Sequence, residues 1–230
     1  MYLAGICFIT DQNICRLPLK EMTRIVLDYG IRWIQYRDKK NTRRLIYENA
    51  IEIKKITSEY DATLIINDHT DIALASESEG AHLGQDDLPL KEARKISGQN
   101  FIIGISTHSI EQALDAQNMG ADYIGFGPIF HTNTKDAGKP KGIRALKEIK
   151  KMVNIPVIAI GGINSENLSS VLNTGVDGIA VSSGILKGDI KTNIANLFKL
   201  KTEYERSFYA GRIAVDTSTT LIPEFHQDGN

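Results

Sequence analysis

The stretch FIIGISTHSIEQALDAQNMGADYIGF, residues 101–126, contains the unit that decides the fold. It opens with a short apolar run at about 101–105, continues with a helical pattern of apolar residues at about 109–119, and closes with a second apolar run at about 121–126. A strand, a helix and another strand in this order predict two parallel strands joined by a crossover helix.

The same alternation fills most of the chain. Apolar, β-branched runs predict strands at about 4–9, 31–36, 62–66, 80–83, 101–105, 121–126, 156–160 and 178–182. Helical patterns predict helices at about 18–29, 42–60, 70–77, 89–97, 109–119, 142–153, 164–174 and 189–205. Eight strand–helix units in 230 residues predict an α/β protein whose sheet closes into a (β/α)8 TIM barrel over residues 1–205. An open doubly wound sheet is the alternative, and the lack of a G-x-G-x-x-G after the first strand weighs against it.

The composition is that of a soluble globular protein, with 42% hydrophobic and 24% charged residues. Lys and Arg number 27 against 28 Asp and Glu, so no overall field attracts nucleic acid or an anionic membrane. The chain has no run of 18 apolar residues, and MYLAGICFITD lacks the basic region of a signal peptide. We therefore expect a cytoplasmic protein.

The two cysteines, Cys7 and Cys15, are too few for a disulfide scaffold or a metal knuckle. Cys7 lies inside an apolar run, which indicates a small core residue.

In a barrel of this kind the active site lies at the carboxyl ends of the strands. The residues at those ends are polar, charged and rich in glycine. They are Thr10-Asp11; Gln35, Arg37 and Lys39; Asn67-Asp68; Gly84-Gln85-Asp86-Asp87; Ser106-Thr107-His108; the loop 127–142; Gly161-Gly162; and Ser182-Ser183-Gly184.

Two glycine-containing turns follow the seventh and eighth strands, where barrels of this type often bind phosphate. Gly161-Gly162 allows close approach of the backbone to an anion, and a short helix after Ser182-Ser183-Gly184 directs N–H groups at it. The alternative is a pair of tight turns that need positive φ angles. We favour a phosphate site.

A second anion site is predicted after the second, third and fourth strands. Gln35, Arg37 and Lys39 share one face, because strand side chains repeat every two residues. Asp68 and Asp87, with Asn67 nearby, suit Mg²⁺, although helix N-caps explain the two aspartates almost as well. Two facing anion sites suggest two phosphorylated substrates.

The loop GPIFHTNTKDAGKPKG, residues 127–142, is long, basic and rich in hydroxyl groups. A mobile surface connection is one interpretation. The other is a flap in which Thr132 and Thr134 bind one substrate, Lys135 binds the other, and closure excludes water.

Six stretches occur in order: IQYRDK at 34–39, IINDHTDIAL at 65–74, GAHLGQDDLP at 80–89, IIGISTHS at 102–109, GADYIGFGPIFHTNTK at 120–135 and IPVIAIGGIN at 155–164. Together they resemble the thiamine phosphate synthase family over about residues 3–200. The resemblance implies a transferase that joins an aminopyrimidine methyl pyrophosphate to a thiazole phosphate and releases pyrophosphate. Two departures stand out: His131 replaces a usual proline, and Ser182 a bulky aliphatic residue.

The resemblance also implies roles for individual residues. The pyrimidine pyrophosphate would contact Gln35, Arg37, Lys39, Asn67, Ser106 and Lys135, of which Arg37, Lys39, Ser106 and Lys135 are catalytic. The thiazole phosphate would contact Thr132, Thr134, Gly162, Ser182 and Ser183, and Mg²⁺ would bind Asp68 and Asp87. Tyr36, Asp38 and Asn133 are also expected to bind substrate.

Two other functions stay open on the sequence alone. A thiazole tautomerase shares the barrel and the thiazole phosphate site, but typically lacks the acidic pair and the T-x-T-K loop. A non-catalytic phosphate-sensing barrel is the third possibility. The role of residues 206–230, expected to form a tail with few periodic apolar positions, and any homo-oligomer are not determined by the sequence.

Overall fold

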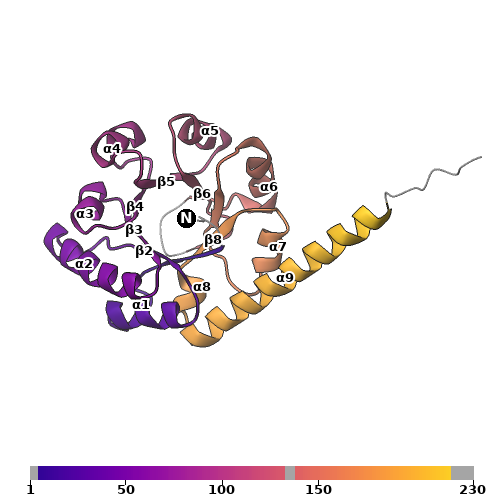
Figure 1. The fold of residues 1–230 in the computed structure, drawn as a ribbon, viewed down its shortest axis with the longest axis horizontal. Helices are drawn as coiled ribbons and strands as arrows, with labels where there is room; N and C mark the ends of the chain where they lie inside the picture. Colours follow the sequence, from indigo (N-terminus) through magenta and orange to yellow (C-terminus); the bar gives the residue numbers. More distant parts are fainter. Residues whose placement is uncertain (1–4, 133–137, 219–230) are drawn as a thin grey trace, which may run out of the picture.

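The computed structural model describes residues 5–132 and 138–218, with side chains as far as Ser207. In these residues eight parallel strands close into a barrel in chain order (Figure 1). The strands are β1 Gly5–Ile9, β2 Trp33–Tyr36, β3 Thr63–Asn67, β4 Gly80–Leu83, β5 Ile102–Thr107, β6 Tyr123–Phe126, β7 Val157–Ile160 and β8 Gly178–Val181. The predicted (β/α)8 barrel is confirmed, and the doubly wound alternative is wrong.

Helices surround the barrel on the outside, as Figure 1 shows. They are α1 Leu19–Asp28, α2 Arg43–Glu59, α3 Thr70–Ala75, α4 Leu90–Ser97, α5 Ile110–Asn118, α6 Gly142–Met152, α7 Leu168–Leu172, α8 Ser183–Leu186 and α9 Ile190–Ser218. Among residues 5–132 and 138–218, no helix combines the length and the apolar character needed to cross a membrane.

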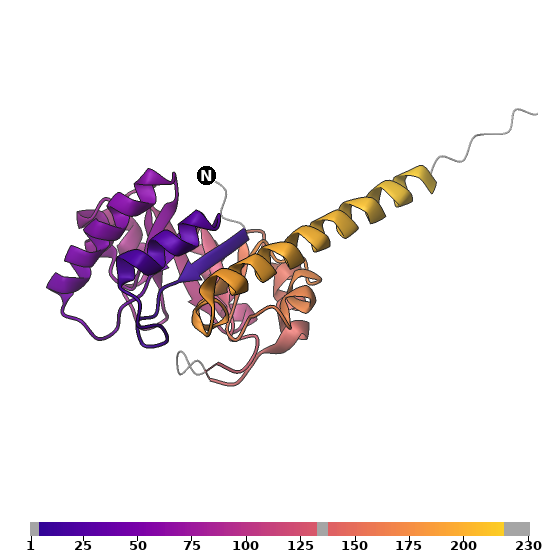
Figure 2. The same ribbon diagram turned by 90° about the horizontal axis from the view of Figure 1, so that it is seen from below.

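The last helix is longer than expected. The sequence predicted its end at about residue 205, but α9 continues to Ser218, and Figure 2 shows it leading away from the barrel wall. The interval contains no proline, since Pro223 is the next one after Pro156, so nothing in it removes a helical N–H. The predicted helix boundary is therefore wrong.

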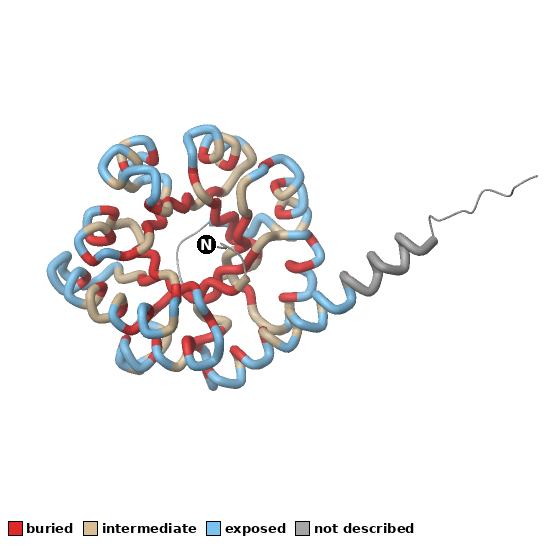
Figure 3. Tube along the Cα trace, viewed as in Figure 1, coloured by how far each residue is buried: buried red, intermediate tan, exposed pale blue. Residues whose placement is uncertain are grey.

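The barrel has an inner and an outer core, and Figure 3 shows the buried strand residues that separate them. Inside the strands, Trp33 and Tyr123 make an edge-to-face contact with ring centroids 5.1 Å apart. Cys7 packs in the same cluster and is 1% exposed, which agrees with its predicted core position. Outside the strands, a larger apolar cluster joins the sheet to the helices.

An acidic residue directly precedes each of the strands β4, β6 and β8 at the bottom of the barrel. Asp122, just before β6, accepts hydrogen bonds from the backbone N–H of Ile103 at 2.7 Å and from the Arg94 guanidinium at 2.6 Å. The same arrangement joins Glu79 to Leu64 and Lys54, and Asp177 to Val157 and Lys150. We call Glu79, Asp122 and Asp177 the basal acid clamps. Each ties one strand to its neighbour and to a helix.

Replacing Asp122 by alanine is expected to lower thermal stability without lowering turnover. Hydrogen bonds to charged groups contribute about 1.5–3 kcal/mol, which corresponds to about 3–12 °C in the unfolding midpoint of a domain this size. Calorimetry and steady-state kinetics measure the two quantities. Asp115→Ala, an exposed change on α5, is the control, and an unchanged midpoint in Asp122→Ala would contradict the role of the clamp.

Truncation after Arg206 is expected to leave both activity and stability nearly intact. Residues 205–207 are exposed, whereas Leu200 and Tyr204 pack against the outer core. A second truncation after Lys199, which removes those two side chains, is the comparison and should lower the unfolding midpoint further. If truncation after Arg206 alone lowers the unfolding midpoint by more than about 8 °C, the segment beyond Arg206 stabilises the barrel.

Candidate active site

A cavity lies at the carboxyl ends of the strands and gathers most of the predicted site residues that the structure describes. Its lining includes Gln35, Arg37, Lys39, Asn67, Ser106, Thr132, Gly162, Ser182 and Ser183. Three of the predicted residues, Asn133, Thr134 and Lys135, lie outside the described residues. The residues from distant parts of the sequence therefore meet in one place.

Side chains alternate along β2 and the residues that follow it, and this alternation decides which of them face the cavity. Gln35, Arg37 and Lys39 line it, as predicted, whereas Tyr36 and Asp38 do not. The Tyr36 hydroxyl donates to Asp38 Oδ2 at 3.1 Å and accepts from Asn49 Nδ2 at 3.2 Å. Asp38 instead lines a neighbouring cavity together with Lys39, Asp68 and Asp87, and the substrate contacts of Tyr36 and Asp38 stay predictions.

Asp38 shapes the loop after β2. It accepts hydrogen bonds from the backbone N–H groups of Lys40 and Asn41 at 3.0 and 3.1 Å, and from Asn41 Nδ2 at 2.7 Å. Burial acts to raise the pKa of Asp38, but these donors outweigh it and the pKa is lowered. An ionised Asp38 therefore fixes the loop from which Lys39 reaches the site.

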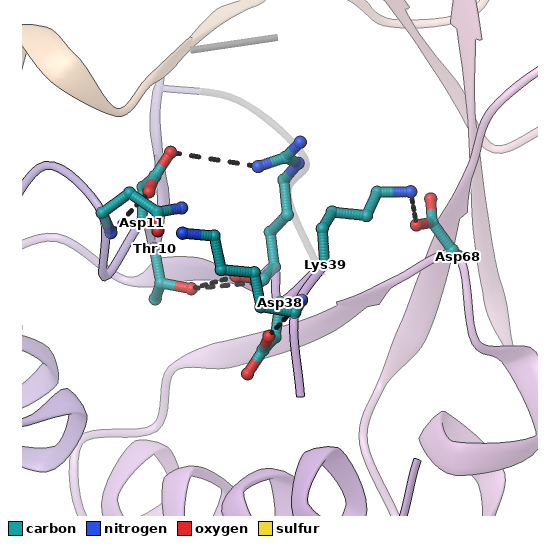
Figure 4. Close-up of polar contacts among 8 residues, drawn as sticks. Thr10, Asp11, Asp38, Lys39 and Asp68 are labelled. Carbon is teal, nitrogen blue, oxygen red and sulfur yellow. Dashed lines mark hydrogen bonds and ion pairs between the residues drawn. The ribbon is translucent and has the colours of Figure 1, made fainter. Parts of the chain in front are cut away.

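Two residues that follow β1, Thr10 and Asp11 (Figure 4), orient Arg37. The Arg37 guanidinium Nη1 lies 3.9 Å from Asp11 Oδ2, and the Arg37 backbone N–H donates to Thr10 Oγ1 at 3.0 Å. Asp11 is only 4% exposed, so the ion pair is shielded from water. The sequence placed Thr10 and Asp11 at a strand end but gave no signal that they support Arg37.

Asp68 forms an ion pair with Lys39, as Figure 4 shows. It has a positive φ of 66° and does not cap α3, because the N-cap of that helix is His69. Asp87 likewise does not cap α4, whose N-cap is Pro89; its Oδ2 instead accepts from the Gly84 N–H at 2.7 Å. The helix-cap interpretation of both aspartates is therefore wrong.

The two aspartates face each other. Burial raises the pKa of Asp87, and its hydrogen bond to the Asp68 carboxyl raises it further. A cation between two facing carboxylates reduces the repulsion between their negative charges. Mg²⁺ commonly takes one or two carboxylates and completes its shell with water and substrate phosphate oxygens, so two carboxylates suit it. The described residues contain no cluster of three or more His, Cys, Asp or Glu side chains, and the Mg²⁺ site stays a prediction.

Gly161 and Gly162 have φ angles of 100° and 67°, so their turn requires glycine. A Cβ on Gly161 would lie 2.6 Å from Pro128 Cα, and one on Gly162 would lie 2.5 Å from the His131 carbonyl oxygen. The tight-turn interpretation is therefore confirmed for this turn, but not for Ser182-Ser183-Gly184, where no residue has a positive φ. Both glycines also line the cavity, so the turn can still contact a ligand. Phosphate binding at this turn stays a prediction.

The turn after β8 leads directly into the short helix α8, as expected. Ser183 begins that helix, and both Ser182 and Ser183 line the cavity. The Ser182 hydroxyl oxygen is buried and has no hydrogen-bond partner among the described residues. A buried hydroxyl of this kind is available to a ligand.

The first residues of the loop 127–142 are anchored to the end of β7 and the turn after it, and Lys141 and Gly142 at the far end donate to the carbonyl oxygens of Pro128 and Ile129. The Ile129 and Phe130 N–H groups donate to the carbonyl oxygens of Ile160 and Gly161 at 2.9 and 3.0 Å. Thr132 lines the cavity, and His131 is exposed. The loop is thus held at its base beside the predicted thiazole phosphate site.

Comparison with known proteins identifies the family. Residues 6–185 match the family described as thiamine monophosphate synthase. The chain belongs to that family. The thiamine-phosphate synthase of Clostridium acetobutylicum is 50% identical over 77% of this chain and 85% of its own. That of Caldanaerobacter subterraneus is 42% identical over 87% and 93%. The solved thiamine phosphate pyrophosphorylase of Pyrococcus furiosus is 39% identical, with a TM-score of 0.81 over 87% of this chain and 96% of that one.

Membership of the thiamine monophosphate synthase family makes this chain a transferase of thiamine biosynthesis, which condenses a pyrimidine with a thiazole moiety. The predicted resemblance is confirmed.

Two residues of the cavity region had no role in the sequence analysis. His82 Nε2 lies 2.9 Å from Ser106 Oγ, and its Nδ1 lies 3.0 Å from the Tyr123 hydroxyl. The only signal in the sequence was a histidine inside the apolar run GAHL.

Proposed function

We propose that the protein carries out its condensation with two phosphorylated substrates held on opposite sides of the barrel mouth. One is an aminopyrimidine methyl pyrophosphate and the other a thiazole phosphate, and the products are thiamine phosphate and pyrophosphate. The observation that carries this proposal is the single cavity shared by Arg37 and Lys39 after β2 and Gly162 after β7. In an eight-stranded barrel β3, with Asn67 and Asp68, lies across from β7.

The pyrophosphate belongs on the β2–β5 side. Arg37 and Lys39 supply positive charge there, and Asn67 and Ser106 supply hydrogen-bonding groups that line the same cavity. Lys135 is assigned to this substrate by the family resemblance alone. Preorganised charges that meet a developing negative charge are commonly the largest contribution to catalysis.

Asp68 and Asp87 would hold Mg²⁺, which when bound supplies positive charge to the pyrophosphate oxygens. The facing carboxylates support this assignment: burial is the main cause of the raised pKa of Asp87, and the neighbouring Asp68 carboxyl raises it further. Lys39 already contacts Asp68, so it sits between the acidic pair and the cavity.

The chain itself needs no nucleophile for this reaction. Departure of pyrophosphate leaves a cationic pyrimidine methylene carbon that the amino-substituted ring stabilises, and the thiazole nitrogen then forms the new bond. The protein contributes position: Arg37 and Lys39 hold one anion, while Gly162, Ser182, Ser183 and Thr132 hold the other. Holding two reactants in line removes much of the entropic barrier of a bimolecular step.

The test is incubation of the purified protein with both substrates and Mg²⁺, followed by chromatographic detection of thiamine phosphate and pyrophosphate. Formation of both in equal amounts supports the proposal. Isomerisation of the thiazole without condensation would assign the chain to the tautomerase, and ligand binding without either reaction would assign it to a phosphate sensor.

We also propose a cytoplasmic location for the enzyme. Its net charge of -1 gives no attraction to anionic membranes, and both described cysteines are free thiols. A homo-oligomer is a further possibility that light scattering in solution would test.

A further inference from the structure

Three side chains on adjacent strands form a connected chain of hydrogen bonds that leads to the cavity. Tyr123 begins β6, His82 lies in β4, and Ser106 lies between them on β5. The Tyr123 hydroxyl is 3.0 Å from His82 Nδ1, and His82 Nε2 is 2.9 Å from Ser106 Oγ. Tyr123 and His82 are 1% and 5% exposed, whereas Ser106 is only partly buried and lines the cavity.

Two glycines make room inside the barrel for the side chains of Tyr123 and His82. A Cβ on Gly104 would lie 2.0 Å from Tyr123 Cζ, and a Cβ on Gly125 would lie 3.1 Å from His82 Cε1. Neither glycine has a positive φ, so the backbone does not require glycine at either position. The requirement is space for the two rings, which indicates that the barrel interior is built around them.

The protonation of Tyr123 decides which group donates in each of these hydrogen bonds. Burial raises the pKa of its phenol well above the ordinary value, so the hydroxyl keeps its proton. A buried hydroxyl proton needs an acceptor, and within the described residues the hydrogen-bond partner of this hydroxyl is His82 Nδ1. A neutral imidazole that accepts at Nδ1 carries its proton on Nε2, and therefore donates to Ser106 Oγ.

This order leaves the Ser106 proton directed away from His82. A hydroxyl has one proton, and its oxygen already accepts from the imidazole. Because Ser106 lines the cavity, its O–H is available to an acceptor there.

We propose that Tyr123 and His82 are positioning residues that fix the Ser106 hydroxyl as a hydrogen-bond donor to an anionic oxygen of the pyrophosphate group. This proposal rests on the proposed function, which places the pyrophosphate on that side of the cavity. Ser106 touches the substrate, and the other two act through it. Without the Tyr123 hydroxyl, His82 can carry its proton on Nδ1, and the Ser106 hydroxyl can then donate to His82 Nε2 instead of to the anion.

The first test needs no substrate. The ¹⁵N and ¹H NMR spectrum of the imidazole groups in the ligand-free protein reports which nitrogen of His82 carries the proton, with His82→Gln used to assign the signal among five histidines. A single Nε2–H form in the wild type and loss of that preference in Tyr123→Phe are expected. An Nδ1–H form in the wild type would overturn the proposal, whatever the enzyme's activity.

The second test measures binding of inorganic pyrophosphate by calorimetry in the full-length protein. Ser106→Ala is expected to weaken binding by about 10–100-fold, the scale of a hydrogen bond to a charged group. Tyr123→Phe should weaken it by about tenfold, and should have no further effect in the Ser106→Ala background.

Tyr60→Phe is the matched control, because it removes a hydroxyl that contacts Asp28 on the outside of the barrel. If Tyr123→Phe binds pyrophosphate as tightly as the wild type, or if the losses of affinity add up in the double variant, Tyr123 does not act through Ser106 and the proposal is overturned. Absence of thiamine phosphate synthesis by the wild-type protein would instead contradict the proposed function, so the two failures are distinguishable.

Discussion

Replacing Asp68 or Asp87 by asparagine is expected to preserve the fold and to lower turnover by about 10²-fold or more, the scale of losing one preorganised charge contact. The fold should survive because neither residue caps a helix. Asparagine tolerates the positive φ of Asp68, and at position 87 its side-chain oxygen can still accept from Gly84. The expected loss therefore comes from the metal and not from stability.

Stability without metal should stay the same or rise in Asp87→Asn. The folded-state pKa of Asp87 is raised, so ionising it in the fold is unfavourable. The stability linked to its proton is present below the unfolded-state pKa and is lost as pH rises through the folded-state pKa. Asparagine removes this loss.

Turnover measured against Mg²⁺ concentration checks the prediction, with unfolding midpoints recorded alongside. Higher Mg²⁺ is expected to restore part of the activity of both variants. Asp86→Asn, an exposed change beside Asp87, is the control. Near wild-type turnover in both aspartate variants at low Mg²⁺ would exclude the metal site.

Replacing Arg37 by alanine is expected to lower kcat/KM by about 10²–10³-fold, and added Mg²⁺ should not restore it. Arg37 lines the cavity with its side chain 16% exposed, and Asp11 holds it in place. Under the proposed function its charge would therefore meet the pyrophosphate directly. Arg37→Lys should recover only part of the loss, because an ammonium group lacks the planar fork of a guanidinium.

The control is Lys40→Ala, which removes one positive charge from the same loop at an exposed position. Equal losses in Arg37→Ala and Lys40→Ala would show a general effect of charge on substrate attraction, and rescue of Arg37→Ala by Mg²⁺ would show that Arg37 serves the metal. Lys135→Ala is expected to resemble Arg37→Ala, on the family resemblance.

The barrel and the face that carries the site were predictable because they depend on local periodicity and on a rule about strand ends. The alternation in FIIGISTHSIEQALDAQNMGADYIGF already implies a parallel sheet. The alternation of Gln35, Arg37 and Lys39 likewise depends only on the two-residue repeat of a strand.

Other features depend on contacts between distant residues. Whether Asp68 and Asp87 cap helices or face each other is decided by where their side chains point, and residue type alone suits both. The support of Arg37 by Asp11, and of Ser106 by His82 and Tyr123, requires side chains that lie on different strands to meet. A single sequence contains no periodicity that reports such meetings.

The basal acid clamps divide the chain into modules. From the helix residue to the acid that it pairs with, the three clamps enclose residues 54–79, 94–122 and 150–177. The segments 84–89 and 127–141 lie between these ranges. Asp68, Ser106 and Gly162 lie within clamped spans, whereas Asp87 and the long loop after β6 lie in the intervals. Changes of length or sequence in the interval loops that keep Asp87 would therefore leave all three clamps intact, so substrate preference can change there while the clamped modules keep their register.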